Sequence, residues 1–151
     1  MSEKLIPINK VGGGGTDIVL LKSAEAQLPS QTSDYDYWGA LCATESIPDI
    51  SKYRFLMANC YNQYGTGYLL FETGIFPVSL VPATDNGDIP FQLFRTINYK
   101  SGNNIAVTTL GIMAFIWGTN GNYRWHPYGY QQDTVKASSG ATLKVELYGI
   151  K

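Results

Sequence analysis

The sequence is poor in charged residues. Asp, Glu, Lys and Arg make up 15% of its 151 residues, against roughly 25% in typical soluble domains. The 11 basic and 12 acidic residues give a formal net charge of −1. Because no basic surplus is present to attract phosphates, we expect no nucleic-acid partner. We also expect no membrane insertion, since no apolar run of about 18 residues occurs and residues 1–4 lack the features of a secretory signal.

Cysteine and histidine are scarce too, with two cysteines and one histidine in the chain. Cys42 and Cys60 lack CxxC spacing and lie among apolar residues, so we expect two buried free thiols. A disulfide between them is the alternative. A zinc site would need more ligands than these two cysteines and His126 can supply. We therefore expect no metal site and no cofactor.

The residues that are abundant indicate a β-rich domain. The chain has 11 Tyr, 6 Phe, 3 Trp and 16 Gly, and low charge with many aromatics is atypical of disordered proteins. Short apolar runs separated by Gly, Asn and Asp turns are typical of antiparallel sheets. We predict an all-β fold, an antiparallel, jelly-roll-like β-sandwich of about seven to nine strands. The predicted strands cover residues 37–43, 53–61, 68–72, 75–81, 91–97, 104–110, 112–117 and 141–150.

The last of these segments has the clearest pattern. Leu143, Val145 and Leu147 alternate with polar side chains, and a period of two places them on one face of a strand. Lys144, Glu146 and Tyr148 fall on the opposite face.

Three regions follow one another along the chain. Residues 1–15 form an N-terminal arm and a tetraglycine joint, residues 16–34 a linker or short helix, and residues 35–151 the sandwich domain. The helix is predicted because residues 22–28 are rich in helix formers before Pro29, although residues 18–21 equally suit a strand. The arm is the candidate for attachment to a partner by strand addition. Its apolar residues are Leu5, Ile6, Ile8 and Val11.

Aromatic residues are densest between Trp117 and Tyr130, which we interpret as a loop. Sugars present apolar C–H faces together with hydroxyls, so flat aromatic rings beside polar side chains suit them. The same residues would equally fill a core or a subunit interface. The candidate glycan-binding residues are Trp117, Tyr123, Arg124, Trp125, His126, Tyr128 and Tyr130. A second polar-aromatic segment, residues 59–68, contains Tyr61, Tyr64 and Tyr68.

Nothing in the sequence indicates catalysis. A catalytic triad could be built only around His126, where no nucleophile motif is present. The acidic residues are scattered through predicted turns or lie singly in predicted strands, so no carboxylate pair for glycoside hydrolysis stands out. We expect a protein that is not an enzyme.

Three short stretches of the sequence stand out. They read Ile47-Pro48-Asp49-Ile50-Ser51-Lys52-Tyr53-Arg54-Phe55-Leu56, Phe76-Pro77-Val78-Ser79-Leu80-Val81 and Leu147-Tyr148-Gly149-Ile150-Lys151. In this order they resemble the strand entry, a mid-chain strand and the closing strand of the C-terminal modules of bacteriophage tail and fibre proteins. The resemblance covers residues 45–151. The binding residues of these modules vary, so none is carried over to this chain.

Such modules are β-sandwiches, commonly homotrimeric, at the tips or surfaces of virions, where many bind host glycans. The resemblance therefore implies a virion structural protein, assembled in the host bacterial cytoplasm, that acts as a short fibre or tip module. Its partners would be copies of itself, other virion proteins and a host-surface glycan. Fibre proteins carry long shafts before the tip, whereas here residues 1–34 precede the predicted sandwich. The alternative is a capsid or tail decoration protein, held by the N-terminal arm, with no receptor role.

Overall fold

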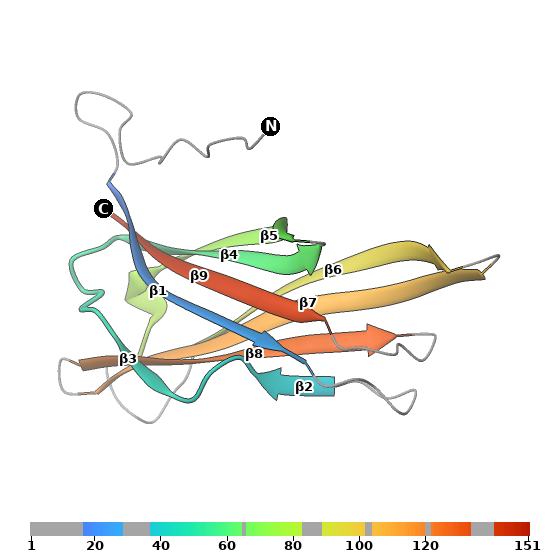
Figure 1. Cartoon of the computed structure of the whole chain (residues 1–151). Helices are drawn as coiled ribbons and strands as arrows, with labels where there is room; N and C mark the ends of the chain where they lie inside the picture. Colours follow the sequence, from blue (N-terminus) through green and yellow to red (C-terminus); the bar gives the residue numbers. More distant parts are fainter. Residues whose placement is uncertain are drawn as a thin grey trace.

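Two antiparallel β-sheets face each other in the computed structural model (Figure 1). The structure describes residues 17–28, 37–64, 66–82, 89–101, 104–119, 122–133 and 141–151. The predicted all-β sandwich is confirmed, with nine strands in the observed order β1 to β9. The predicted arm and glycine joint, residues 1–15, lie outside the described residues, as do the attachment candidates Leu5, Ile6, Ile8 and Val11.

Sheet A has four strands, and the first and last strands of the described residues are neighbours in it. Its order is β1 (Ile18–Gln27), β9 (Thr142–Ile150), β4 (Phe55–Tyr64) and β5 (Gly67–Pro77). Ile18 pairs with Ile150, so the start of β1 lies beside the end of β9 (Figure 1).

Sheet B has five strands. Its order is β2 (Tyr37–Ala40), β8 (Asn122–Asp133), β7 (Asn104–Thr119) and β6 (Ile89–Ser101). The short strand β3 (Glu45–Ile47) also pairs with β8, at a position separate from that of β2. The β6–β7 hairpin extends beyond β8. The two strands pair from Ser101 and Asn104 onward, whereas β8 pairs with β7 only from Thr108 onward.

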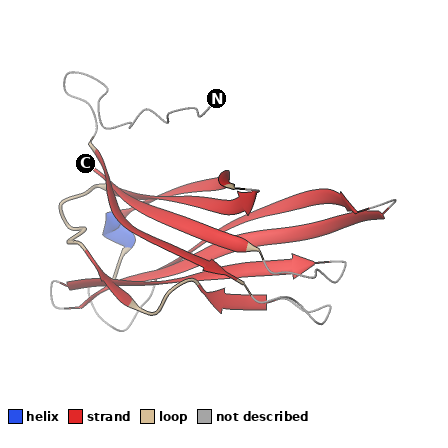
Figure 2. Cartoon of the chain, viewed as in Figure 1, coloured by secondary structure: helices blue, strands red, loops and turns tan. Residues whose placement is uncertain are grey.

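Helical structure is limited, in the described part of the chain, to the 3-10 turn η2 (Val78–Leu80) after β5 (Figure 2). No helix there is long and apolar enough to cross a membrane.

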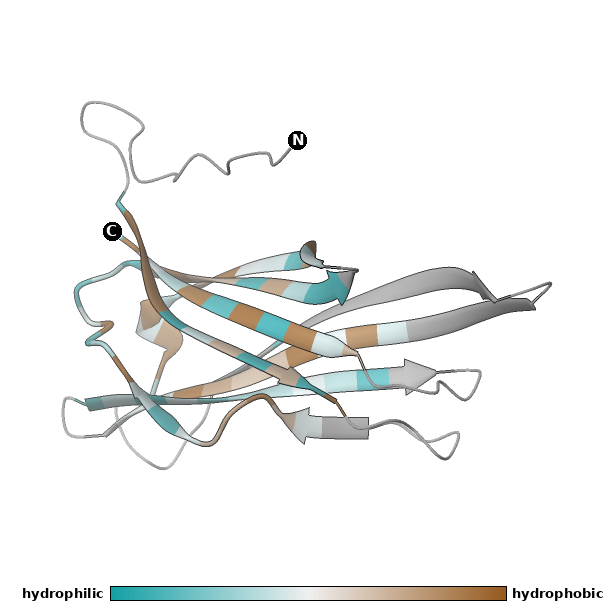
Figure 3. Ribbon diagram, in the orientation of Figure 1, coloured by the Kyte–Doolittle hydropathy of each residue, from teal (hydrophilic) through white to brown (hydrophobic). Residues whose placement is uncertain are grey.

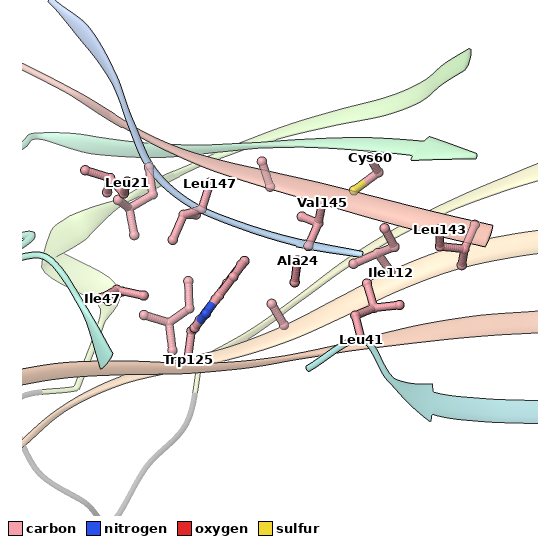
Figure 4. Close-up of a cluster of buried hydrophobic side chains, with 14 of the residues drawn as sticks. Leu21, Ala24, Leu41, Ile47, Cys60, Ile112, Trp125, Leu143, Val145 and Leu147 are labelled. Carbon is pink, nitrogen blue, oxygen red and sulfur yellow. The ribbon is translucent and has the colours of Figure 1, made fainter. Parts of the chain in front are cut away.

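The core fills the space between the two sheets. The predicted alternation of β9 is confirmed, since Leu143, Val145 and Leu147 are fully buried and the intervening side chains are partly exposed. Hydrophobic and hydrophilic residues alternate along β9 (Figure 3). These three face Ile112 and Trp125 of sheet B across the sandwich (Figure 4). Burying one such aliphatic side chain contributes about 1.5–3 kcal/mol.

A local hydrogen-bonded turn leads the chain into β4. The carboxylate of Asp49 accepts the Ser51 N–H at 2.9 Å, and the Tyr53 N–H donates to the Ile50 carbonyl at 3.0 Å. This satisfies backbone donors before the strand begins at Phe55.

The helix alternative is wrong for residues 18–27, which belong to the sandwich, whereas residues 16 and 29–34 lie outside the described residues. Residues 18–27 form β1, which pairs with β9 along its whole length. Pairing with a neighbouring strand overrides the helix propensity of residues 22–28. A bulge between Leu20 and Lys22 lets Leu21 enter the core.

Two further strand boundaries differ from prediction. The two strands predicted over residues 68–72 and 75–81 are one continuous strand, β5, which ends at Pro77. Residues 78–80 form the turn η2 instead. Residues 104–117 likewise form the single strand β7, because Gly111 stays within the ladder opposite Tyr130. Gly111 pairs with Phe94 on one side and with Tyr130 on the other, so both ladders continue through it.

Candidate functional site

The predicted aromatic loop is a β-strand. β8 begins at Asn122 and includes Pro127, although proline is disfavoured inside a sheet. Pro127 is tolerated because its missing N–H would face the side where β2 ends and β3 has not begun. Its carbonyl, on the same side, accepts the Leu41 N–H at 2.9 Å. The loop interpretation therefore fails because the proline falls at a gap between two partner strands.

The pleat of β8 divides the predicted glycan-binding residues between two faces. Trp125 is fully buried in the core and the partly buried Tyr123 packs against the core cluster, so both lie on the inner face of sheet B. The even-numbered residues of β8 fall on the outer face of sheet B, where Trp117 of β7 pairs with Arg124. The structure thus places Trp117, Arg124, His126, Tyr128 and Tyr130 on one outer face. These five residues, together with Met113 and Phe115, are called the aromatic band below.

Three of the rings in the aromatic band contact one another. The rings of Phe115 and Tyr128 meet edge to face at 5.9 Å between centroids. The His126 ring lies 4.4 Å from the Tyr128 ring. Edge-to-face contacts hold aromatic rings in defined orientations, so the band is an ordered surface across β7 and β8.

Hydroxyl groups hold the imidazole of His126. Its Nδ1 lies 3.3 Å from Oγ1 of Thr44 and 3.2 Å from the hydroxyl of Tyr128. Because a hydroxyl can donate or accept, the two groups can hold either tautomer of the ring. Thr44 lies just before β3 and 82 residues from His126, so the sequence gives no local signal of this contact.

The aromatic band offers apolar surface with a few polar groups at its margins. Trp117, His126 and Tyr128 are partly exposed, whereas Tyr130 is 8% exposed and adds little contact area. Arg124 is exposed at the end beside Trp117. Rings combined with hydroxyl, imidazole and guanidinium donors suit binding of a flat, hydroxyl-rich ligand.

A second cluster lies on the outer face of sheet A and includes Tyr61 and Tyr68 from the second predicted segment. The side chain of Tyr64 lies outside the described residues. Tyr61 and Tyr148 both donate to Oε2 of Glu146, at 2.9 and 2.7 Å. Lys144 bonds the other carboxylate oxygen at 2.9 Å.

Lys144 also lies over the rings of Tyr61 and Tyr68, 5.6 and 5.2 Å from their centroids. Sequence reasoning placed Lys144, Glu146 and Tyr148 on one face but did not connect them with Tyr61, which is 85 residues from Glu146. Since Lys144 and the two tyrosine hydroxyls satisfy the carboxylate of Glu146, we interpret this cluster as stabilising the sheet and not as a binding site.

The hydrogen bonds of this cluster shift its pKa values. Burial raises the pKa of Glu146, but hydrogen bonds from Tyr148, Lys144 and Tyr61 outweigh it, so the pKa lies below its ordinary value. Burial and the bond to Glu146 raise the pKa of Tyr61 to about 12. The same causes raise the pKa of Tyr148.

The two cysteines are free thiols, Cys60 buried and Cys42 partly buried. Burial raises the pKa of both, with the charge of Glu72 adding to the effect at Cys60, whose pKa is about 12. Among the residues that the structure describes, no group of three or more His, Cys, Asp or Glu side chains could hold a metal ion.

Comparisons with protein-family models, with curated proteins and with solved structures found no match to this chain.

Proposed function

We propose that this protein is a bacteriophage virion structural protein, a short fibre or tip module that binds a host-surface glycan through the aromatic band. It would act without catalysis or a cofactor and as an oligomer, as the resemblance implies. The observation that carries the binding proposal is the ordered contact between Phe115, His126 and Tyr128 on an outer sheet face. An aromatic surface of this kind, in a protein whose net charge is −1, suits ligands recognised by ring stacking and hydrogen bonds.

The glycan proposal can be tested with variants of the residues that the structure places on the outer face of sheet B. Trp117→Ala and Tyr128→Ala remove exposed rings without entering the core. We expect each to weaken binding to host cells and to the best ligand of a glycan array by about tenfold or more, equivalent to about 1.4 kcal/mol.

Tyr68→Ala is the matched control, because Tyr68 is 40% exposed on sheet A, away from the band. Circular dichroism verifies that all three variants fold. Wild-type binding by both band variants would refute the proposed site.

The alternative function is capsid or tail decoration through the N-terminal arm. It is favoured by the apolar residues of the arm, Leu5, Ile6, Ile8 and Val11, which suit strand addition to a partner. Deleting residues 1–15 leaves β1 intact and should abolish loading onto particles while preserving the fold. Particles that load the truncated protein normally would exclude this alternative.

A further inference from the structure

Sheet A exposes several large apolar side chains. They belong to β1, β4 and β5 and to the adjoining turn η2. These residues are Val19, Leu20, Phe55, Tyr68, Leu69, Leu70, Ile75 and Leu80. Single exposed apolar residues are ordinary, but a contiguous group marks an interaction surface.

The strand register shows that some of them are contiguous. Leu20 pairs with Tyr148, Tyr148 with Met57, and Met57 with Ile75, which makes a row across all four strands of sheet A. The adjacent row on the same face is Ile18, Ile150, Phe55 and Pro77. These eight residues are called the apolar rows below.

Three residues of the apolar rows are well exposed: Ile75 is 61% exposed, Leu20 53% and Phe55 37%. The other five are partly exposed. The rows contain no charged side chain. The polar rows beside them hold Lys144 and Glu146, which form an ion pair at 2.9 Å, and the exposed Glu25 opposite Lys144. Two copies that meet at the apolar rows would therefore bring no like charges together at the centre of the contact.

The size of the face also suits another copy of the chain. Four strands at about 4.8 Å spacing and ten residues at about 3.3 Å per residue give a face of roughly 600 Å² before side-chain relief is counted. A stable interface buries about 800 Å² on each partner, with an apolar centre and a polar rim. The apolar rows would supply the centre and the Asn59–Thr73 and Lys144–Glu146 pairs the rim.

We propose that the outer face of sheet A, centred on Leu20, Phe55 and Ile75, is the surface through which copies of this chain associate. The inference rests on the oligomer included in the proposed function and specifies its interface. Association through sheet A would leave the aromatic band on sheet B exposed in every copy. Several bands would then be presented together, and multivalency would strengthen glycan binding.

The test is the solution mass of the full chain by light scattering or analytical ultracentrifugation. The wild type should have a multiple of the 16.6 kDa chain mass, and Ile75→Glu should be a folded monomer. Leu69→Glu is the matched control. Leu69 lies on the same strand and is 48% exposed, but it pairs with Asn62 on the inner side of the sheet, so this variant should remain oligomeric.

Leu20→Gln, on the opposite edge strand, repeats the test should Ile75→Glu fail to fold. A monomeric wild type, or oligomers that survive both changes on the apolar rows, would overturn the proposal. Glycan binding is scored separately. Trp117→Ala should keep the wild-type mass, and the Ile75→Glu monomer should keep monovalent glycan affinity, so the two proposals can fail independently.

Discussion

The ring of Tyr53 occupies the space that a side chain at Gly149 would need. A methyl group on Gly149 would come within 2.6 Å of Cγ of Tyr53, closer than real Cβ contacts allow. Both residues are buried, so the ring of Tyr53 has little room to withdraw. The contact ties the entry of β4 to the last strand of the sandwich.

Gly149→Ala should therefore destabilise the fold by about 1–3 kcal/mol, the usual cost of overpacking a core. Urea unfolding followed by circular dichroism measures the loss. Gly67→Ala is the control, because nothing lies within 4 Å of the corresponding methyl position, and its effect should stay within about 0.5 kcal/mol. Equal stabilities for the two variants would contradict the packing at Tyr53.

Trp125 should behave as a core residue rather than as part of a binding site. Trp125→Ala should cost about 3–5 kcal/mol of unfolding free energy, because it empties a fully buried position. Trp125→Phe should cost less, since it fills much of the space and also removes the indole N–H, which is buried without a hydrogen-bond partner in the described structure. Trp117→Phe, on the outer face, should change stability by less than about 1 kcal/mol. A Trp125→Ala variant as stable as Trp117→Phe would place the indole outside the core.

The tyrosines bonded to Glu146 should make stability fall at high pH. Their folded pKa values are raised, to about 12 for Tyr61, so their contribution is present below the ordinary value of about 10 and is lost as pH rises through the folded values. Tyr61→Phe and Tyr148→Phe should each cost about 1 kcal/mol at neutral pH and flatten the alkaline loss. Urea unfolding from pH 7 to the alkaline range and tyrosinate absorbance measure both effects.

The acid limb has the opposite sign. Because the folded pKa of Glu146 is lowered, its contribution is present above the ordinary carboxyl pKa and is lost as pH falls through the folded value. Glu146→Gln should flatten this loss. Glu72→Gln is the control, because Glu72 accepts only a long 3.3 Å bond from the Thr73 N–H at an exposed position. Identical acid profiles for the two variants would argue against the Glu146 network.

The two thiols should differ in reactivity. A thiolate is the reactive form, so the raised pKa of buried Cys60, about 12, should limit its labelling to molecules that unfold. Cys42 is partly exposed and should react first in the native protein. Thiol labelling of Cys42→Ser and Cys60→Ser variants, with and without denaturant, measures this difference. Fast native labelling of the Cys42→Ser variant would contradict the burial of Cys60.

Local patterns predicted part of this fold well. Alternation in the last strand correctly identified Leu143, Val145 and Leu147 as core, because a period of two is written in consecutive residues. The helix alternative for residues 18–27 failed because β9, which holds that segment as a strand, is more than a hundred residues away. Propensity cannot register such a partner.

The candidate site shows the same limit. Aromatic density singled out the region of β7 and β8. It assigned all the candidate residues to one surface, whereas the pleat of β8 divides them between the two faces of the sheet. Trp125 and Arg124 are adjacent in sequence but lie on opposite faces of the sheet. Assigning residues 122–133 to a strand would have separated them by odd and even position. Thr44 and the Glu146 network depended on distant pairings that left no local signal.

The place of β9 in sheet A has a consequence for how the protein is made. β9 lies between β1 and β4, so these two strands join only through a segment that the ribosome synthesises after both. Sheet B can assemble its β6–β7–β8 hairpins from neighbouring segments, whereas sheet A stays divided until β9 is released from the exit tunnel. Long-range pairings of this kind slow folding and leave strand edges open meanwhile. The edges of β1 and β4 that face each other across β9 should therefore stay unpaired in the nascent chain until β9 has been synthesised.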